Sequence, residues 1–222
     1  DSAEARLLEA RLHRRFAEDQ VNHGADAEEP LRKAIAGAQA ALGLAPEWFR
    51  ARLELGRCFW LWGQSRQQRN QDPREQLRQA VEHFEQIRRE DRDYEYSNHL
   101  GLIFESLAVY EKNVGMDPLP HLGKAAEAYL MATQLDAHLP DAWINLGSAW
   151  LSRASQPGNP EAEADLERAR GALEEARALN PQHVAPYFFA AQVHELAARR
   201  RRARGEERRP ELARALELYR QG

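Results

Sequence analysis

The side chains that could carry out chemistry are few, and their spacing does not bring them together. The single cysteine, Cys58, excludes an internal disulfide and a cysteine-based zinc site. His194-Glu195 lacks the second histidine four residues after the first that a zinc-binding helix requires. Adjacent carboxylates such as Glu174-Glu175 diverge by about 100° on a helix, so they do not form an acid–base pair. We therefore predict no catalytic residue, no metal site and no cofactor site.

Signatures of nucleotide chemistry are also missing. The chain has neither a Gly-x-Gly-x-x-Gly string nor a Gly-Lys-Ser/Thr string, which are the glycine-rich loops that hold phosphates. Arg92-Asp93 lacks the preceding histidine and the later asparagine of a kinase catalytic loop. The chain by itself is predicted not to be an enzyme.

Three further side chains are explained best by packing or by a groove. His194 falls at a repeated aromatic position, which favours a packed core histidine. Cys58 is predicted to be a buried, inert thiol. His99 lies at the edge of a predicted helical stripe, from which it would face a groove.

Charge and hydropathy limit the partners. The chain has 222 residues, and 31 Lys and Arg against 35 Asp and Glu give a net charge of −4, which does not favour a polyanion partner. The run Arg199–Arg209 has no interleaved aromatic residues, so we expect a solvated face and regard polyanion binding as a third hypothesis. No apolar run approaches the ~18 residues of a membrane span, and a cytoplasmic location is expected.

Two short strings recur along the chain with one period. Leu-x-x-Ala, followed four residues later by an apolar residue, begins at Leu31, Leu77, Leu122, Leu166 and Leu212. These leucines are 46, 45, 44 and 46 residues apart. A second string, a pair of Leu-Gly or Ala-Ala with a ring three residues later, centres on Gly56, Gly101, Gly147 and Ala191. Its steps are 45, 46 and 44 residues, so two independent strings indicate a repeat of about 45 residues.

Helix-breaking residues divide each period into two helices. A Gly or Asn precedes a Pro near the middle of every period, and Pro46, Pro140 and Pro181 mark junctions between periods. Ala, Leu, Glu, Gln and Arg are abundant, and strand-like alternation is absent. The sequence therefore predicts an all-α chain of ten helices in five hairpins. It would form a single repeat domain over 1–222, with units 1–46, 47–92, 93–138, 139–182 and 183–222.

The fourth unit carries a family pattern. Trp143, Leu146-Gly147 and Trp150 on one helix, with Ala169, Leu173 and Ala176 on the next and Pro181 at the exit, resemble the tetratricopeptide (TPR) repeat. The resemblance covers about residues 47–222 and implies an α-solenoid, a right-handed superhelix of about five helix-turn-helix units that binds proteins. The glycines Gly56, Gly101 and Gly147 are expected where two helices cross closely, against Ala80, Ala125 and Ala169.

This chain departs from the TPR pattern in three ways. The common unit has ~34 residues, so these units have longer helices, and they resemble arrays appended to bacterial serine/threonine kinases. The first helix, Ala5 to Val21, has no Leu-Gly pair and takes Leu8, Leu12 and Phe16 as its apolar stripe. The tenth helix ends without a polar cap, so we expect the parent protein to continue, or another chain to contact this helix.

In TPR-like arrays the first helices line a concave groove, and counting from each Leu-Gly pair selects its candidate residues. The groove would be basic at the second unit and acidic beyond it, with Trp60 and Phe188 as apolar anchors. Packing under the lengthened helix is an equal alternative for Trp60. The full partner-binding set is Arg50, Leu53, Arg57, Trp60, Asn98, Glu105, Asn145, Phe188 and Gln192.

The carboxylate clamp known from some TPR domains does not transfer to this chain. Asn145 keeps one clamp position, but the corresponding positions hold Glu54, His99 and Phe189. The leading hypothesis is thus a non-catalytic scaffold for a protein or peptide of unknown identity. The alternative is the regulatory arm of a larger multidomain enzyme, with a bacterial serine/threonine kinase as first choice.

Overall fold

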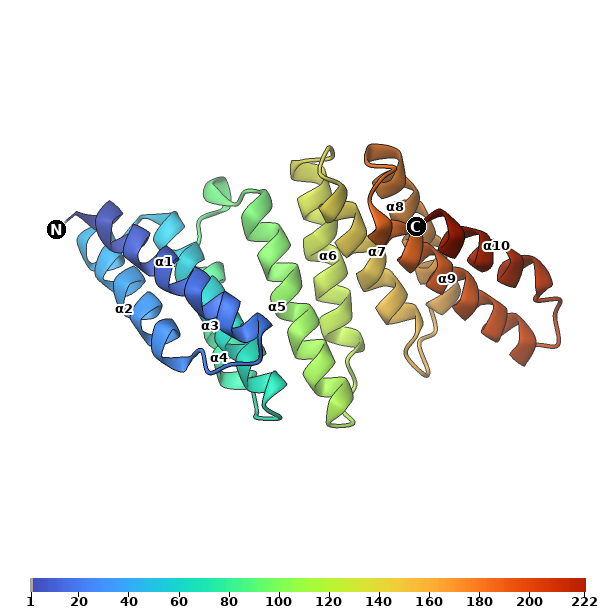
Figure 1. Ribbon diagram of the computed structural model, residues 1–222, viewed down its shortest axis with the longest axis horizontal. Coiled ribbons are helices and arrows are strands. Elements are labelled where there is room, and N and C mark those ends of the chain that lie inside the picture. The colour runs from blue at the N-terminus through green and yellow to red at the C-terminus, as the bar shows by residue number, and fades with distance from the viewer. Residues whose placement is uncertain (1) are drawn as a thin grey trace. The chain divides into compact units, whose positions relative to one another are not determined.

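The computed structural model describes residues 2–222, and within them the chain is all-helical with no strand. Ten α-helices and one 3-10 turn, Arg89–Asp91, follow one another in this range (Figure 1). The α-helices are α1 (Ala3–Asn22), α2 (Glu28–Leu44), α3 (Phe49–Gln68), α4 (Arg74–Glu85), α5 (Tyr94–Asn113), α6 (Leu119–Leu135), α7 (Pro140–Ala154), α8 (Ala162–Leu179), α9 (Val184–Ala203) and α10 (Arg209–Gln221). The predictions of an all-α chain and of ten helices are confirmed.

The turns inside the hairpins form as the breakers predict. Each of the five turns has one residue with left-handed backbone, at Gly24, Asn70, Gly115, Gly158 and Gly205. Glycine adopts this conformation without a Cβ clash, which explains its use at four of the five turns. An Asp or Asn side chain then often closes the turn: Asp72 Oδ1 accepts a hydrogen bond from the Arg74 amide at 3.0 Å.

Two compact units divide the chain, unit 1 at Asp1–Met116 and unit 2 at Asp117–Gly222. Within unit 1, α1 packs on α2 and α3 on α4, and the first helices α1, α3 and α5 also contact one another in succession. Within unit 2, α7 packs on α8 and α9 on α10, while α7 contacts α9. The boundary falls inside the third predicted repeat, and a single domain over 1–222 stays a prediction.

Glycine marks close helix crossings, as the repeat pattern predicts. A Cβ added at Gly56 would overlap the ring of Phe84 and lie 3.3 Å from the Ala80 carbonyl oxygen. A Cβ at Gly147 would lie 2.6 Å from Leu173 Cγ and 3.4 Å from the Ala169 carbonyl oxygen. The roles predicted for these two glycines, and for Ala80 and Ala169 opposite them, are confirmed.

This close packing gives a prediction with a matched control. Gly56→Ala should lower the free energy of unfolding by about 1–2 kcal/mol, because the fully buried Phe84 ring has no room to move away. Gly171→Ala, inside α8 with nothing within 4 Å of the new Cβ, should instead raise it by about 0.5–1 kcal/mol through helix propensity. Urea denaturation measures both changes in the free energy of unfolding. If both have the same sign, the claim that Gly56 is required by a close helix crossing is wrong.

The apolar stripe expected on the first helix is wrong in its direction. Leu8, Leu12 and Phe16 are 63%, 68% and 56% exposed, and we call these three residues the α1 ridge. The buried face of α1 is instead formed by Leu7, Ala10, Arg14, Ala17 and Val21. On this face Ala10 must be small because α2 approaches closely there: a Cβ added at Gly37 would lie 3.2 Å from Ala10 Cβ. Large side chains do not fit into that crossing.

Candidate functional site

Three of the predicted groove residues, Arg50, Leu53 and Arg57, line one cavity in unit 1. The cavity has a volume of about 680 Å³ and lies over α1, α3 and the start of α5; we call it the α1–α3–α5 cavity. Its lining residues are Leu8, Arg11, Leu12, Arg14, Arg15, Phe49, Arg50, Leu53, Arg57, Asp93, Tyr94 and Glu95. Three of the four positions predicted from the second unit thus share one surface with α1, and the fourth, Trp60, does not line the cavity.

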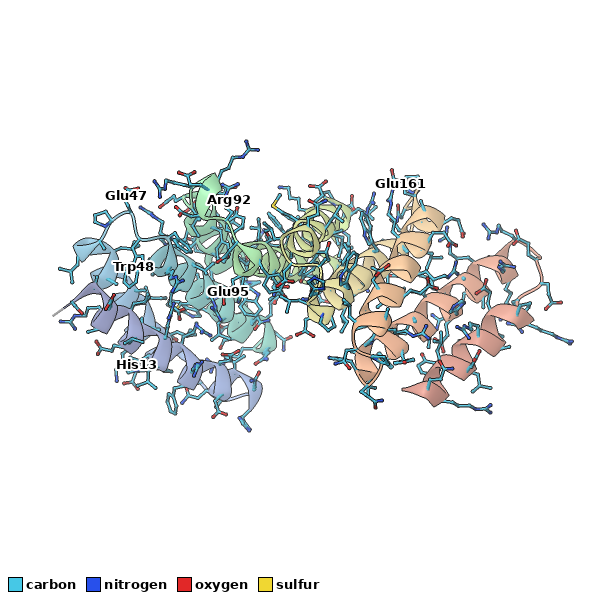
Figure 2. All side chains as sticks on the ribbon, turned by 90° about the horizontal axis from the view of Figure 1, so that it is seen from above. His13, Glu47, Trp48, Arg92, Glu95 and Glu161 are labelled. Carbon is cyan, nitrogen blue, oxygen red and sulfur yellow. The ribbon has the colours of Figure 1, made fainter. Side chains whose placement is uncertain are left out.

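The lining of this cavity is strongly basic. Five of its side chains are arginines and two are carboxylates, Asp93 and Glu95. Figure 2 labels Glu95, which lies in the first turn of α5. Arg15 and Arg50 are exposed, and Arg50 lies over the ring of Phe49 with its guanidinium carbon 5.8 Å from the ring centroid. Such a surface attracts anionic groups.

A buried ion pair forms the floor of the cavity. The Glu54 side chain is 1% exposed, and its Oε1 accepts a hydrogen bond from Arg14 Nε at 2.6 Å. Arg14 also reaches Glu18 at 3.1 Å, and Arg11 Nε lies 3.7 Å from the second oxygen of Glu54. The pair joins α1 to α3 and holds Arg14 below the cavity.

Arg57 occupies the same floor with less support. Its nearest carboxylate is Glu95 at 3.7 Å, and its Nε is buried without a hydrogen-bond partner in the described structure. Burial and then the charge of Arg14 lower the pKa of the Arg57 guanidinium. The charge of Arg57 is therefore incompletely neutralised within the described chain, and an added carboxylate would stabilise it.

Trp60 is anchored by packing within unit 1. Its indole Nε1 donates a hydrogen bond to Ser106 Oγ at 3.1 Å, and its ring meets the His99 imidazole edge-on at 6.0 Å between centroids. The ring also packs against buried core residues of unit 1. These contacts favour the packing alternative for Trp60, and its place in a groove stays a prediction.

His99 is partly buried between Trp60 and Phe84, and this environment keeps it neutral. Burial and the nearby charge of Arg57 lower the pKa of His99 to about 4, although its Nδ1 donates a hydrogen bond to the Glu95 carbonyl oxygen at 2.8 Å. The imidazole of His99 thus packs between aromatic rings, whereas the sequence predicted that it would face an open groove.

This low pKa predicts a pH dependence of stability. A histidine with a folded pKa below its unfolded value binds its proton more readily in the unfolded chain, so stability falls as the pH drops from about 6.5 to 4. His99 should account for a loss of about 3 kcal/mol over this range. His99→Phe should remove that part of the loss in urea unfolding at pH 7 and pH 4. If the wild type and His99→Phe lose the same stability between pH 7 and pH 4, the assignment of this loss to His99 is wrong.

The other groove candidates are spread over α5 and unit 2. Asn98 and Glu105 are partly buried on α5, and Asn145 and Gln192 are partly buried on α7 and α9. Phe188 is 47% exposed, with its ring 6.0 Å from that of Tyr219 on α10. None of these residues lines the α1–α3–α5 cavity.

Two further predictions concern buried groups. Cys58 is fully buried, as predicted, and burial followed by the charge of Glu54 raises the pKa of its thiol, which disfavours the reactive thiolate. His194 is a partly buried residue between α9 and α10, and its Nδ1 lies 2.5 Å from Glu211 Oε2. His194 is therefore packed, but in a polar contact and not in the apolar core.

Most arginines of the Arg199–Arg209 run have carboxylate partners within unit 2. Arg200 and Arg204 both reach Glu163, at 2.8 and 3.0 Å, and Arg201 reaches Glu211 at 3.2 Å. These pairs already neutralise part of the run, which favours a solvated face over a polyanion contact.

Metal sites and membrane-spanning helices are two further features to consider in the described part of the chain. In residues 2–222, no three His, Cys, Asp or Glu side chains are placed to hold a metal ion together. Within the same residues, no helix combines the length and the apolar character needed to cross a membrane.

Sequence reasoning missed Arg11, Arg15 and Glu54 as parts of this site. The groove positions are counted from Leu-Gly pairs, and α1 has none, so the sequence predicts no groove residue on this helix. The four-residue spacing of Arg11 and Arg15, next to Leu8 and Leu12, is the signal that places them on one helical face.

Comparison with known proteins defines the fold class. No family model matches the chain, and no curated protein matches its sequence. One solved structure of MamA is similar, with a TM-score of 0.58 and 14% identity over 87% of each chain. A second MamA structure has a TM-score of 0.56 and 15% identity, covering 95% of this chain and 92% of its own. The chain thus has a helical-repeat fold of the TPR type.

Proposed function

We propose that this chain is a non-catalytic interaction module that binds a peptide or a helix of a partner protein against its first helices. The observation that carries the proposal is the α1–α3–α5 cavity, where exposed arginines stand beside the exposed leucines Leu8 and Leu12. An apolar surface rimmed by charged residues is typical of protein-binding sites. The fold shared with a helical-repeat protein supports the same class.

The variant for the test must leave the core intact. Trp60 and Arg57 contact the core or its buried ion pair, so their replacement would disturb folding. Arg50 and Leu8 are exposed and line the cavity, which makes Arg50→Glu with Leu8→Ser the appropriate cavity variant. Arg89→Glu with Leu44→Ser changes charge and apolar area by the same amounts at exposed positions outside the cavity.

Affinity purification from the host lysate, quantified by mass spectrometry, tests the proposal with these proteins. We expect at least one protein to be retained by the wild-type chain and by the control variant but lost from the cavity variant. Circular dichroism should be the same for all three. If no retained protein depends on the cavity, the proposal is wrong.

A second candidate function is supported by the long repeat unit. The first helices α3 and α5 have 20 residues each, as expected for the extended units that resemble kinase-appended arrays. Under this proposal the chain is the regulatory arm of a larger enzyme, with a bacterial serine/threonine kinase as first choice. A kinase domain in the same reading frame would support it, and a gene limited to these residues would exclude it.

An exposed apolar face of α10 is a second candidate surface for binding a partner protein. On α10, Leu212, Leu216 and Tyr219 are 42%, 51% and 39% exposed. The spacing of four and three residues places them on one helical face. A contact with another chain through this face stays a prediction.

A further inference from the structure

We propose that the α1 ridge and the α1–α3–α5 cavity together bind an acidic amphipathic helix of a partner protein. The inference rests on the proposed interaction function and names the chemistry of its ligand. It combines an apolar ridge, a row of arginines parallel to it and an under-neutralised guanidinium at the base of the cavity.

The α1 ridge has the geometry that suits a helix. Leu8, Leu12 and Phe16 follow one another at four-residue steps, so they form a straight row along α1. Leu8 and Leu12 border the cavity of about 680 Å³, while Leu12 and Phe16 border a second hollow of about 500 Å³ between α1 and α2. A partner helix has grooves between the rows of its own side chains. The α1 ridge, with a hollow on each side, fits into such a groove when the partner helix lies along α1.

Charge is uneven on the two sides of the ridge. On the side of the α1–α3–α5 cavity, the partly buried Arg11 and the exposed Arg15 repeat the four-residue step, and the exposed Arg50 of α3 adds a third cation. Neither Arg15 nor Arg50 forms an ion pair with any residue of the described chain. The partner helix is therefore expected to place its carboxylates on this side.

The second hollow lacks this excess. Its cation Lys33 lies 2.8 Å from Glu29, and its carboxylate Asp26 lies 2.9 Å from Arg69. Its charges are thus paired within the chain, so this side selects for apolar contact and the cavity side selects for negative charge.

The base of the cavity favours a carboxylate in particular. Arg57 has only the Glu95 oxygen at 3.7 Å, which is longer than a charge-assisted hydrogen bond. A glutamate or aspartate side chain that enters the cavity would supply a closer acceptor at the open edge of the guanidinium, between Arg57 and Arg50. A basic helix would meet five arginines there and be repelled.

Selection from a phage-displayed library of random 16-residue peptides tests this inference on the intact chain. We expect the enriched peptides to be net negative and to carry apolar residues four residues apart. One of them, synthesised and labelled for fluorescence anisotropy, should bind about tenfold more weakly to Arg15→Glu with Arg50→Glu. Leu12→Ser should weaken it as well, and Arg89→Glu should leave it unchanged.

The outcomes separate the inference from the function on which it rests. Three results would each contradict the proposal of an acidic helical partner. They are enrichment of basic peptides, binding that is insensitive to the arginine and Leu12 variants, and no enrichment at all. A lysate protein that still depends on the cavity would then leave the interaction function standing. If the lysate experiment also fails, both proposals are wrong.

Discussion

Glu54→Gln should lower the free energy of unfolding by about 3–5 kcal/mol, the largest effect expected of any single substitution in this chain. The Glu54 and Arg14 side chains are 1% and 9% exposed, so removal of the negative charge leaves the buried guanidinium with the half-exposed Glu18, at 3.1 Å, as its remaining carboxylate. Arg57, on the same floor, would lose a compensating charge as well. Chemical denaturation followed by circular dichroism measures the loss.

Glu82→Gln is the matched control for this substitution. Glu82 is also on a helix of unit 1 and is paired with Arg78, but its side chain is 49% exposed. Its replacement should lower the free energy of unfolding by less than about 1 kcal/mol. The double variant Arg14→Met with Glu54→Leu should recover most of the stability that Glu54→Gln loses, since it removes both buried charges. A loss of under about 1 kcal/mol for Glu54→Gln would contradict the buried ion pair.

Asp165→Ala should lower the free energy of unfolding of unit 2 by about 2–3 kcal/mol. Asp165 is fully buried, and its carboxylate accepts hydrogen bonds from Arg153 at 3.0 Å, Arg168 at 2.8 Å and Asn159 at 2.8 Å. These bonds fix the turn between α7 and α8, where the Asn159 side chain also donates to the Arg153 carbonyl oxygen at 2.9 Å.

The loss of stability is expected to be smaller than for Glu54 because Arg153 and Arg168, which surround Asp165, are less buried than Arg14. Arg153 keeps Glu161 at 2.9 Å, and the Arg168 side chain is 46% exposed and reaches water. Glu167→Ala on the same helix, with its side chain 70% exposed, is the control and should change stability by less than about 1 kcal/mol. Equal effects of the two substitutions in urea unfolding would show that the Asp165 cluster contributes little.

The fold was predictable because close helix crossings impose a residue type at a fixed spacing. Gly56 and Gly147 are required where a Cβ would collide with Phe84 or Leu173, so the crossings appear in the sequence as a period. The turns are equally visible, since left-handed backbone favours glycine.

The site was predictable only in part, because it depends on α1. Hydrophobicity alone assigned Leu8, Leu12 and Phe16 to the apolar stripe of this helix, whereas the buried face contains Leu7 and also Ala10, which lies in tight contact with Gly37. The pairing of Arg14 with Glu54 joins residues 40 positions apart. No spacing rule within one helix reports such a contact, so the charged floor of the cavity was not visible in the sequence.

Site-specific photo-cross-linking in the host cell tests most directly the central claim that unit 1 binds a partner through the α1–α3–α5 cavity. Benzoylphenylalanine replaces Leu12 or Arg50 at the cavity, or the exposed Leu44 on α2 as a control. We expect the Leu12 and Arg50 positions to cross-link to the same partner protein, through an acidic helical segment, and the Leu44 position not to cross-link to it. Cross-links only from the Leu44 position, or from none of the three, would contradict it.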